Sequence, residues 1–158
     1  MPDLLVPLYK LPPRDAGEDS LRKQGVLLRR PNTFELTPVC EFIRAHFSQG
    51  WADETAATFA RQPITSVIAT EEGRVVGFAA YESTRRGFFG PTGVLDSHRG
   101  RGIGRALLLS ALWGLNDLGY AYGIIGGAGP VEFYQKAAGA IVIPDSAPGI
   151  YTDLLKRD

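Results

Sequence analysis

Apolar residues along the chain follow two spacings, and the changes from one spacing to the other predict where helices and strands begin. Short apolar runs bounded by glycine, proline or charged residues are typical of strands, whereas apolar residues three and four positions apart are typical of helices. The expected strands are residues 26–28, 66–70, 74–81, 87–95, 120–126, 140–143 and 150–155. The expected helices are residues 37–47, 52–60, 102–118 and 130–138.

The order of these elements favours one mixed α/β sheet. A tight Glu-Glu-Gly turn at residues 71–73 predicts a β-hairpin between the strands at 66–70 and 74–81. The longest helix, 102–118, has a continuous apolar side and is followed by Gly119, a residue type that commonly ends helices. Strands and helices do not alternate one by one, so we expect helices on the faces of a mixed sheet rather than a simple βαβ repeat.

The first 24 residues differ from the rest of the chain, because they are rich in proline and in charges of both signs. Leu4 to Tyr9 could form a short strand, and the nearby prolines would limit its pairing, so we expect it at an edge of the sheet. We therefore divide the chain into an N-terminal lead, residues 1–24, and a single domain, residues 25–158.

Composition and charge exclude several classes of partner. The 158 residues are enough for one domain with a substantial core, and 17 basic residues balance 17 acidic ones. A nucleic-acid surface would need a basic excess, and a membrane span would need about 18–20 consecutive apolar residues, so we expect neither partner. The start of the chain lacks the charged and apolar regions of a signal peptide, and the single Cys40 cannot form an intrachain disulfide. We therefore expect a cytoplasmic protein.

A glycine-rich turn joins the strand at 87–95 to the longest helix. From residue 99 to residue 105 its sequence is Arg-Gly-Arg-Gly-Ile-Gly-Arg. The first N–H groups of a helix have no partner within the helix and lie at its positive end, and glycines leave room for a phosphate beside them. Arg99, Arg101 and Arg105 add positive charge. We therefore expect a diphosphate to bind at the start of this helix.

Residue spacing excludes the other common phosphate and metal motifs. The dinucleotide fingerprint needs a third glycine where this chain has Arg105 or Leu107, and no Gly-Lys-Ser or Gly-Lys-Thr of a P-loop is present. The chain also lacks the Gly-x-Ser-x-Gly and His-Glu-x-x-His motifs. With only His46 and His98, no histidine-rich cluster can form, so we expect no metal. We expect His46 on a helix face and His98 in a solvated loop.

In its motifs and element order the chain resembles the GNAT superfamily of acyl-CoA N-acyltransferases, over roughly residues 26–156. Residues 99–104 match the family's (Gln/Arg)-x-x-Gly-x-Gly pyrophosphate loop. Residues 132–140 match its second signature, in which Phe-Tyr is followed by Gly and an apolar residue. Residues 87–109 and 144–151 also resemble an uncharacterised bacterial subgroup. The resemblance implies an α/β fold with a mixed, mostly antiparallel sheet of six to seven strands flanked by about four helices.

The same resemblance implies an enzyme that moves an acetyl group from acetyl-CoA, its co-substrate, to a primary amine by direct attack. A non-catalytic acyl-CoA-binding or sensing domain of the same fold and a nucleotide-phosphate binder are the alternatives. Members of the family are often dimers, so a homodimer is open, although no feature of the sequence decides it.

The resemblance also implies roles for single residues. The backbone of Val94 and Leu95 would hold the pantetheine arm like an added strand, and one of their N–H groups would polarise the thioester carbonyl. Tyr134 would be the catalytic residue, as hydrogen-bond donor or general acid for the departing thiolate. The family often has Asn and Ala where this chain has Gly127 and Pro130, so an Asn contact to the arm is lost or replaced by backbone. The residues expected to hold the pyrophosphate are Arg99, Gly100, Arg101, Gly102, Ile103, Gly104 and Arg105.

The acceptor pocket is expected between the first two helices and the last strands. Trp51, between these two helices, could form a wall of the pocket or could equally anchor the core. By analogy with the family, residues 88–92 and 148–151 would face the same region, and their aromatic, uncharged character favours a small-molecule amine over a polycationic protein tail. An alkyl ammonium, with a pKa of about 10, must lose a proton before it attacks. The sequence does not identify the base, and Glu54 and Glu82 are the carboxylates to test.

Overall fold

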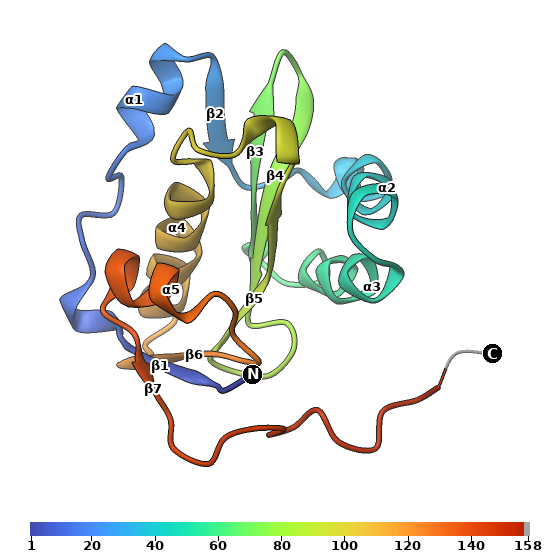
Figure 1. Cartoon of the computed structure of the whole chain (residues 1–158). Helices are drawn as coiled ribbons and strands as arrows, with labels where there is room; N and C mark the ends of the chain where they lie inside the picture. The colour runs from blue at the N-terminus through green and yellow to red at the C-terminus, as the bar shows by residue number, and fades with distance from the viewer. Residues whose placement is uncertain (157–158) are drawn as a thin grey trace.

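One sheet of seven strands runs through the protein, in the order β2-β3-β4-β5-β6-β1-β7 (Figure 1). The computed structural model describes residues 1–156. The strands are β1 (Leu4–Pro7), β2 (Val26–Arg29), β3 (Ser66–Glu71), β4 (Arg74–Tyr81), β5 (Phe88–Val94), β6 (Tyr122–Ile125) and β7 (Ile141–Val142). The α-helices are α1 (Glu18–Lys23), α2 (Leu36–His46), α3 (Gln49–Thr58), α4 (Ile103–Asp117) and α5 (Val131–Ala138). The short 3-10 helices are η1 (Leu8–Lys10), η2 (Thr33–Glu35) and η3 (Asp96–His98).

Neighbouring strands are antiparallel except β5 and β6, which run parallel. The expected mixed, mostly antiparallel sheet of six to seven strands is therefore confirmed. The four expected helices correspond to α2, α3, α4 and α5. The additional helix α1 has six residues, of which only Leu21 is buried, so its sequence carries no recognisable apolar pattern.

Helices cover both faces of the sheet, with α4 against one face and α2 and α3 against the other (Figure 1). Because successive side chains of a strand point to opposite faces, β3 and β4 contribute to both cores. Ile68 and Phe78 pack with the residues of α2 and α3. Their neighbours Val67 and Ala79 pack on the other face with α4. The sheet is therefore the middle of three layers.

Helix α4 lies so close to β4 that one of its interior residues must be glycine. A Cβ at Gly114 would lie 2.3 Å from Cζ of the Tyr81 ring, and this tyrosine is buried, with 1% of its surface exposed. The ring is also held in place, because the Tyr81 hydroxyl accepts a hydrogen bond from the guanidinium group of Arg30. The contact leaves no room for a side chain at position 114.

Gly114→Ala should therefore destabilise the protein. Overpacking of a core costs about 1–3 kcal/mol, and the higher helix propensity of alanine offsets about 1 kcal/mol of that cost. We expect the free energy of unfolding, measured by urea denaturation, to fall by up to about 2 kcal/mol. Gly104→Ala in the same helix is the matched control, because its Cβ would meet no atom closer than Cγ2 of Val94 at 3.7 Å. Equal stability of the two variants would contradict the close contact at Tyr81.

The strand near the N-terminus is not at an edge of the sheet, so that expectation is wrong. β1 pairs with β6 on one side and with β7 on the other. β7 pairs only with Leu4 and Leu5, so the later part of β1 has no partner on that side. Pro7, which has no N–H to donate, is the last residue of this part. Leu4, Val6 and Leu8 are fully buried. Residues 1–24 thus contribute to the same sheet and core as the rest of the chain.

No strand forms at residues 150–155, where the sequence predicted one. The chain instead turns before this segment, with the N–H of Tyr151 donating to the carbonyl oxygen of Pro148 at 3.1 Å, and Asp153 has a φ of +51°. This backbone cannot continue an extended ladder, and Leu154 and Leu155 are left exposed.

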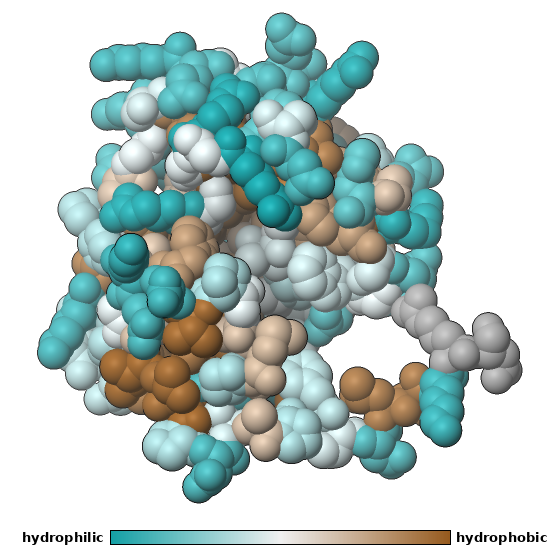
Figure 2. Space-filling view, in the orientation of Figure 1, coloured by the Kyte–Doolittle hydropathy of each residue, from teal (hydrophilic) through white to brown (hydrophobic). Residues whose placement is uncertain are grey.

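Figure 2 shows apolar surface on the side of the molecule where α5 and β7 lie. β7 is the two-residue edge of the sheet, and both of its residues are exposed.

Candidate active site

Strands β5 and β6 begin as neighbours and then separate. Their Cα pairs are Phe88–Ile124 and Phe89–Ile125, although β5 continues to Val94. On its other side β5 stays paired with β4 as far as the Gly77–Val94 pair. Residues 90–94 therefore have one side paired with β4 and one side that no strand of the described residues covers. We call this second side the free edge of β5.

The free edge presents the backbone of Val94 and not that of Leu95. The N–H of Leu95 donates to the carbonyl oxygen of Val76 at 2.9 Å, and the carbonyl oxygen of Leu95 accepts from the N–H of His98 at 2.9 Å. The N–H and C=O groups of successive residues in an antiparallel pair point alternately toward and away from the partner strand. The N–H and C=O groups of Thr92 and Val94 therefore point away from β4. Of the two residues expected to hold the pantetheine arm, only Val94 has its backbone groups on the free edge.

Two residues of the glycine-rich turn have a left-handed backbone. Gly100 and Gly102 have φ values of +76° and +86°, a conformation that favours glycine, and a Cβ at either position would have no neighbour within 4 Å. The first hydrogen bond of α4 joins the N–H of Ala106 to the carbonyl oxygen of Gly102 at 3.1 Å. The N–H groups of Ile103, Gly104 and Arg105 therefore have no partner within the helix, and Gly102 has no side chain to cap them. These donors lie at the positive end of a 15-residue helix.

The three arginines of the turn have different surroundings. Arg101 donates to Oε2 of Glu71 at 2.9 Å and to Oε1 of Gln24 at 3.1 Å, so its guanidinium group holds the turn against the β3–β4 hairpin. Arg99 forms an exposed ion pair with Asp96 at 3.1 Å. Arg105 is exposed, and the ion pairs of residues 1–156 do not include it.

His98 is not the solvated loop residue that the sequence predicted. Its Nε2 lies 3.0 Å from Oε1 of Glu71, its Nδ1 lies 2.8 Å from Oγ of Ser97, and only 17% of its side chain is exposed. The hydrogen bonds from His98 and Arg101 lower the pKa of Glu71 below its ordinary value of 4.5. Glu71 thus fixes the two ends of the segment 98–101.

Glu71→Gln should loosen residues 98–101 and weaken the binding of a diphosphate at the start of α4. Because the pKa of Glu71 is lowered in the folded protein, its stabilising effect is fully present above pH 4.5 and is lost as the pH falls through the lower folded value. Between about pH 7 and about pH 3, the range in which carboxylates titrate, we expect the melting temperature to fall less in the variant than in the wild type. Glu72→Gln, an exposed neighbour, is the control. The same pH profile for wild type and Glu71→Gln would contradict the role of this carboxylate.

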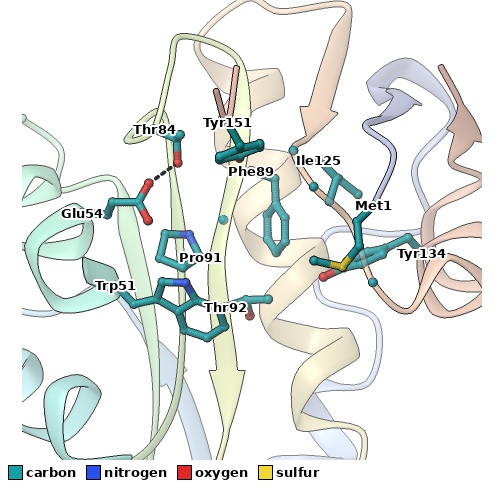
Figure 3. Close-up of a pocket in the computed structure, with 14 residues that line it drawn as sticks. Met1, Trp51, Glu54, Thr84, Phe89, Pro91, Thr92, Ile125, Tyr134 and Tyr151 are labelled. Carbon is teal, nitrogen blue, oxygen red and sulfur yellow. Dashed lines mark hydrogen bonds between the residues drawn. The ribbon is translucent and has the colours of Figure 1, made fainter. Parts of the chain in front are cut away.

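A cavity of about 280 Å³ opens at the free edge of β5 (Figure 3). It brings together the three segments that the sequence placed around the acceptor: Trp51 of α3, residues 89–92 of β5 and Tyr151 of the C-terminal segment. Gly126 also lines it, and a Cβ there would lie 2.5 Å from the hydroxyl oxygen of Tyr151. The glycine run after β6 therefore lets Tyr151 approach the cavity.

Tyr134 lines the same cavity and is buried, with 7% of its surface exposed. Its ring packs edge to face against Phe89 and Phe133, with centroid distances of 6.2 Å and 5.1 Å. Burial raises the pKa of the Tyr134 hydroxyl, and none of the side-chain hydrogen bonds of the described residues uses that hydroxyl. A neutral phenol in this position can donate a proton to a group in the cavity.

The two candidate carboxylates have different positions. Glu54 lines the cavity, and its Oε1 accepts a hydrogen bond from Oγ1 of Thr84 at 2.6 Å. Glu82 is buried outside the cavity, where it accepts from the hydroxyl of Tyr120 at 2.9 Å and from the N–H of Gly87. Glu82 therefore holds the loop between β4 and β5, and Glu54 is the carboxylate that a bound molecule can reach.

Cys40 and the two histidines lie outside the cavity. The Cys40 thiol is 3.8 Å from the carbonyl oxygen of Ala52, and burial raises its pKa, so the reactive thiolate is disfavoured. His46 is exposed on α2, where its ring contacts that of Phe42, as expected for a residue on a helix face.

Among residues 1–156, no group of three or more His, Cys, Asp or Glu side chains is placed to hold a metal ion. No helix of this part of the chain is long and apolar enough to cross a membrane.

Comparisons with known proteins show a family and a shared fold. Residues 31–139 match the model of the acetyltransferase (GNAT) family. A GCN5-related glucosamine N-acetyltransferase region of a fungal multi-domain GH3 β-N-acetylglucosaminidase is 18% identical with a TM-score of 0.73, over 90% of this chain and 19% of that one. A GCN5-related N-acetyltransferase from Sphaerobacter thermophilus is 22% identical with a TM-score of 0.70, over 90% of this chain and 48% of that one.

A GNAT family acetyltransferase from Brucella melitensis, solved in complex with acetyl-CoA, is 22% identical with a TM-score of 0.58, over 75% of this chain and 86% of that one. The chain thus spans 19% and 48% of the first two structures, and these likenesses show a shared fold. No curated protein matches the chain. Because the family model covers more than half of its residues, the chain belongs to the GNAT acetyltransferase family.

Proposed function

We propose that the protein is an N-acetyltransferase that moves an acetyl group from acetyl-CoA to the primary amine of a small molecule by direct attack. The observation that carries this proposal is the hydroxyl of Tyr134. This residue is buried and lines a cavity at the free edge of β5, and none of the side-chain hydrogen bonds among residues 1–156 uses its hydroxyl. A proton donor in that position suits the departure of a thiolate.

The residues of the turn and of the free edge fit acetyl-CoA, which would supply an activated thioester. The free N–H groups of Ile103, Gly104 and Arg105 would bind the pyrophosphate, and the open space beside Gly100 and Gly102 would admit it. Arg99 and Arg105 would add charge at its rim. Arg101 would act through Glu71, by holding the turn in place.

Val94 would hold the pantetheine arm along the free edge, and its N–H group would polarise the thioester carbonyl. The amine first loses one proton to solvent, its nitrogen then forms the C–N bond, and the C–S bond breaks. Tyr134 gives its proton to the departing sulfur and regains a proton from the acylated nitrogen through solvent. The net products are an amide, a free thiol and one proton.

A sensing domain that binds acyl-CoA without turnover is the second candidate, and one observation favours it. Family members often have an Asn at position 127, and the glycine of this chain has its N–H committed to Oδ1 of Asp3 at 2.8 Å. The backbone at Gly127 therefore cannot supply the donor that the missing Asn side chain would have given.

Calorimetric titration of the protein with acetyl-CoA, ADP and NAD tests the proposal, followed by thiol release with a panel of amines. We expect selective binding of acetyl-CoA and thiol release with at least one small amine. Absence of acetyl-CoA binding at millimolar concentration in folded protein would exclude the acetyltransferase. Binding without thiol release from any amine would favour the sensing domain. The homodimer, the lack of a nucleic-acid partner and the cytoplasmic location stay predictions.

A further inference from the structure

One residue sets the charge of the cavity. Among the described residues that line it, only Glu54 has a side chain that is ionised at neutral pH, and no lysine, arginine or histidine joins it. None of the salt bridges of residues 1–156 includes Glu54. A half-buried carboxylate without an ion-pair partner attracts a cationic ligand, because such a ligand would compensate its lost hydration.

The Glu54 carboxylate is held in one orientation. Oγ1 of Thr84 donates to Oε1 of Glu54 at 2.6 Å, and Oγ of Ser83 donates to the backbone carbonyl of the same residue. Oε2 remains available to a ligand. Figure 3 shows Glu54 and Tyr134 on opposite walls, so a ligand between them could meet both.

The walls between these two groups are largely apolar. Trp51 stacks on Phe47 with a centroid distance of 5.6 Å and meets Phe78 edge to face at 6.3 Å, which fixes its ring beside the cavity. Phe89 and Tyr151 contribute two further rings to the lining. Flat apolar groups pack well on such faces, and aromatic faces also attract cations. At about 280 Å³ the cavity is at the small end of ligand sites, so its occupant is compact.

The side chains that line the cavity offer no cation for a carboxylate of the substrate. None of them is a lysine, arginine or histidine, and two backbone donors beside the cavity are already used. The N–H of Gly127 donates to Asp3 and the N–H of Ala128 donates to the carbonyl oxygen of Pro2 at 2.8 Å. A substrate carboxylate would lose hydration without a cationic side chain to compensate it, and it would be repelled by Glu54.

We propose that the acceptor is a compact primary amine with a flat apolar body and no carboxylate, whose ammonium group binds to Glu54. This inference rests on the proposed acetyltransferase activity and names the substrate class of the same site. Glu54 is the residue that selects the cation, and Thr84 positions its carboxylate.

Two comparisons test the substrate class, one for the carboxylate and one for the flat apolar body. With saturating acetyl-CoA, kcat/KM for 2-phenylethylamine should exceed that for L-phenylalanine, which adds only a carboxylate, by about 10-fold or more. It should also exceed the value for glucosamine, a polar amine without a carboxylate. Equal turnover of 2-phenylethylamine and either competitor would overturn the inference but leave the acetyltransferase intact. Absence of acetyl-CoA binding would instead remove the proposed function itself.

Glu54→Gln tests the selecting residue, and Asp53→Asn is the matched control on the next position of the same helix. Asp53 is exposed and does not line the cavity, so both variants lose one negative charge but only one changes the site. We expect Glu54→Gln to raise KM for 2-phenylethylamine by about 10-fold, with acetyl-CoA affinity unchanged and Asp53→Asn close to wild type. A fall in kcat at unchanged KM would overturn the binding role of Glu54.

Binding can be followed without turnover, because Trp51 lines the cavity and the chain has only one other tryptophan. In a Trp113→Phe background, Trp51 fluorescence should respond to 2-phenylethylamine and hardly to 2-phenylethanol, its uncharged analogue. Thr84→Val should weaken the response several-fold, because the carboxylate loses its fixed orientation. An equal response to the amine and the alcohol would overturn the role of the ammonium group.

Discussion

Replacing Tyr134 with phenylalanine should lower kcat for acetyl transfer by about 100-fold while the Kd for acetyl-CoA changes little. Only the hydroxyl is removed, and the ring keeps its edge-to-face contacts with Phe89 and Phe133, so the fold of the site is preserved. The departing sulfur would then leave without a proton donor beside it. Steady-state thiol release gives kcat, and calorimetric titration with acetyl-CoA gives the Kd.

The pH dependence of the wild-type protein sharpens this test. Burial raises the pKa of Tyr134 above its ordinary value of 10.0, so the hydroxyl keeps its proton throughout the neutral range. When Tyr134 loses this proton, kcat should fall, and this fall should therefore occur above pH 10.0. The fall should be absent from Tyr134→Phe. Tyr151→Phe is the control, because Tyr151 is the other tyrosine of the cavity lining. A wild-type kcat for Tyr134→Phe would assign the proton donor to another group.

Local patterns were enough to predict the elements around the site. The hairpin of β3 and β4 and the helices α2 to α5 each carry their own apolar spacing and their own turn residues. The position of β1 was not predictable in the same way, because its partners β6 and β7 lie more than a hundred residues later in the chain. The C-terminal strand was expected from its apolar residues alone, but a strand also needs a partner with compatible backbone, which residues 150–155 lack.

The residues of the candidate site also fall into those that the sequence could predict and those that it could not. The turn at residues 99–105 and Tyr134 lie in local motifs, and the structure has the turn at the start of α4 and Tyr134 in the lining of the cavity. The distinction between Val94 and Leu95 depends on which backbone groups face β4, and sequence does not give that register. Glu71 was visible only as part of a hairpin turn, although it joins residues 27 and 30 positions away. Contacts of this kind have no signal in a single sequence.

Gly102→Ala should weaken acetyl-CoA binding by about 10-fold or more, and it should do so through the diphosphate alone. Gly102 has a φ of +86° and stands just before the free N–H groups of α4. A methyl group there meets no protein atom within 4 Å, so it would occupy the space that the structure leaves open for the anion. Acetyl-pantetheine lacks the diphosphate, and its weaker binding should be the same in variant and wild type by calorimetric titration.

The backbone strain of this substitution must be separated from its effect on binding. An alanine in the left-handed conformation costs about 1–2 kcal/mol, and part of any lost affinity could follow from a shifted turn. Gly17→Ala is matched for that strain, because Gly17 also precedes a helix, has a φ of +84° and has no neighbour within 4 Å of its Cβ. Both variants should lose similar stability in urea, and only Gly102→Ala should lose affinity for acetyl-CoA. If the two variants bind acetyl-CoA equally well, the anion does not sit at the start of α4, and the arginines at its rim lose their proposed role with it.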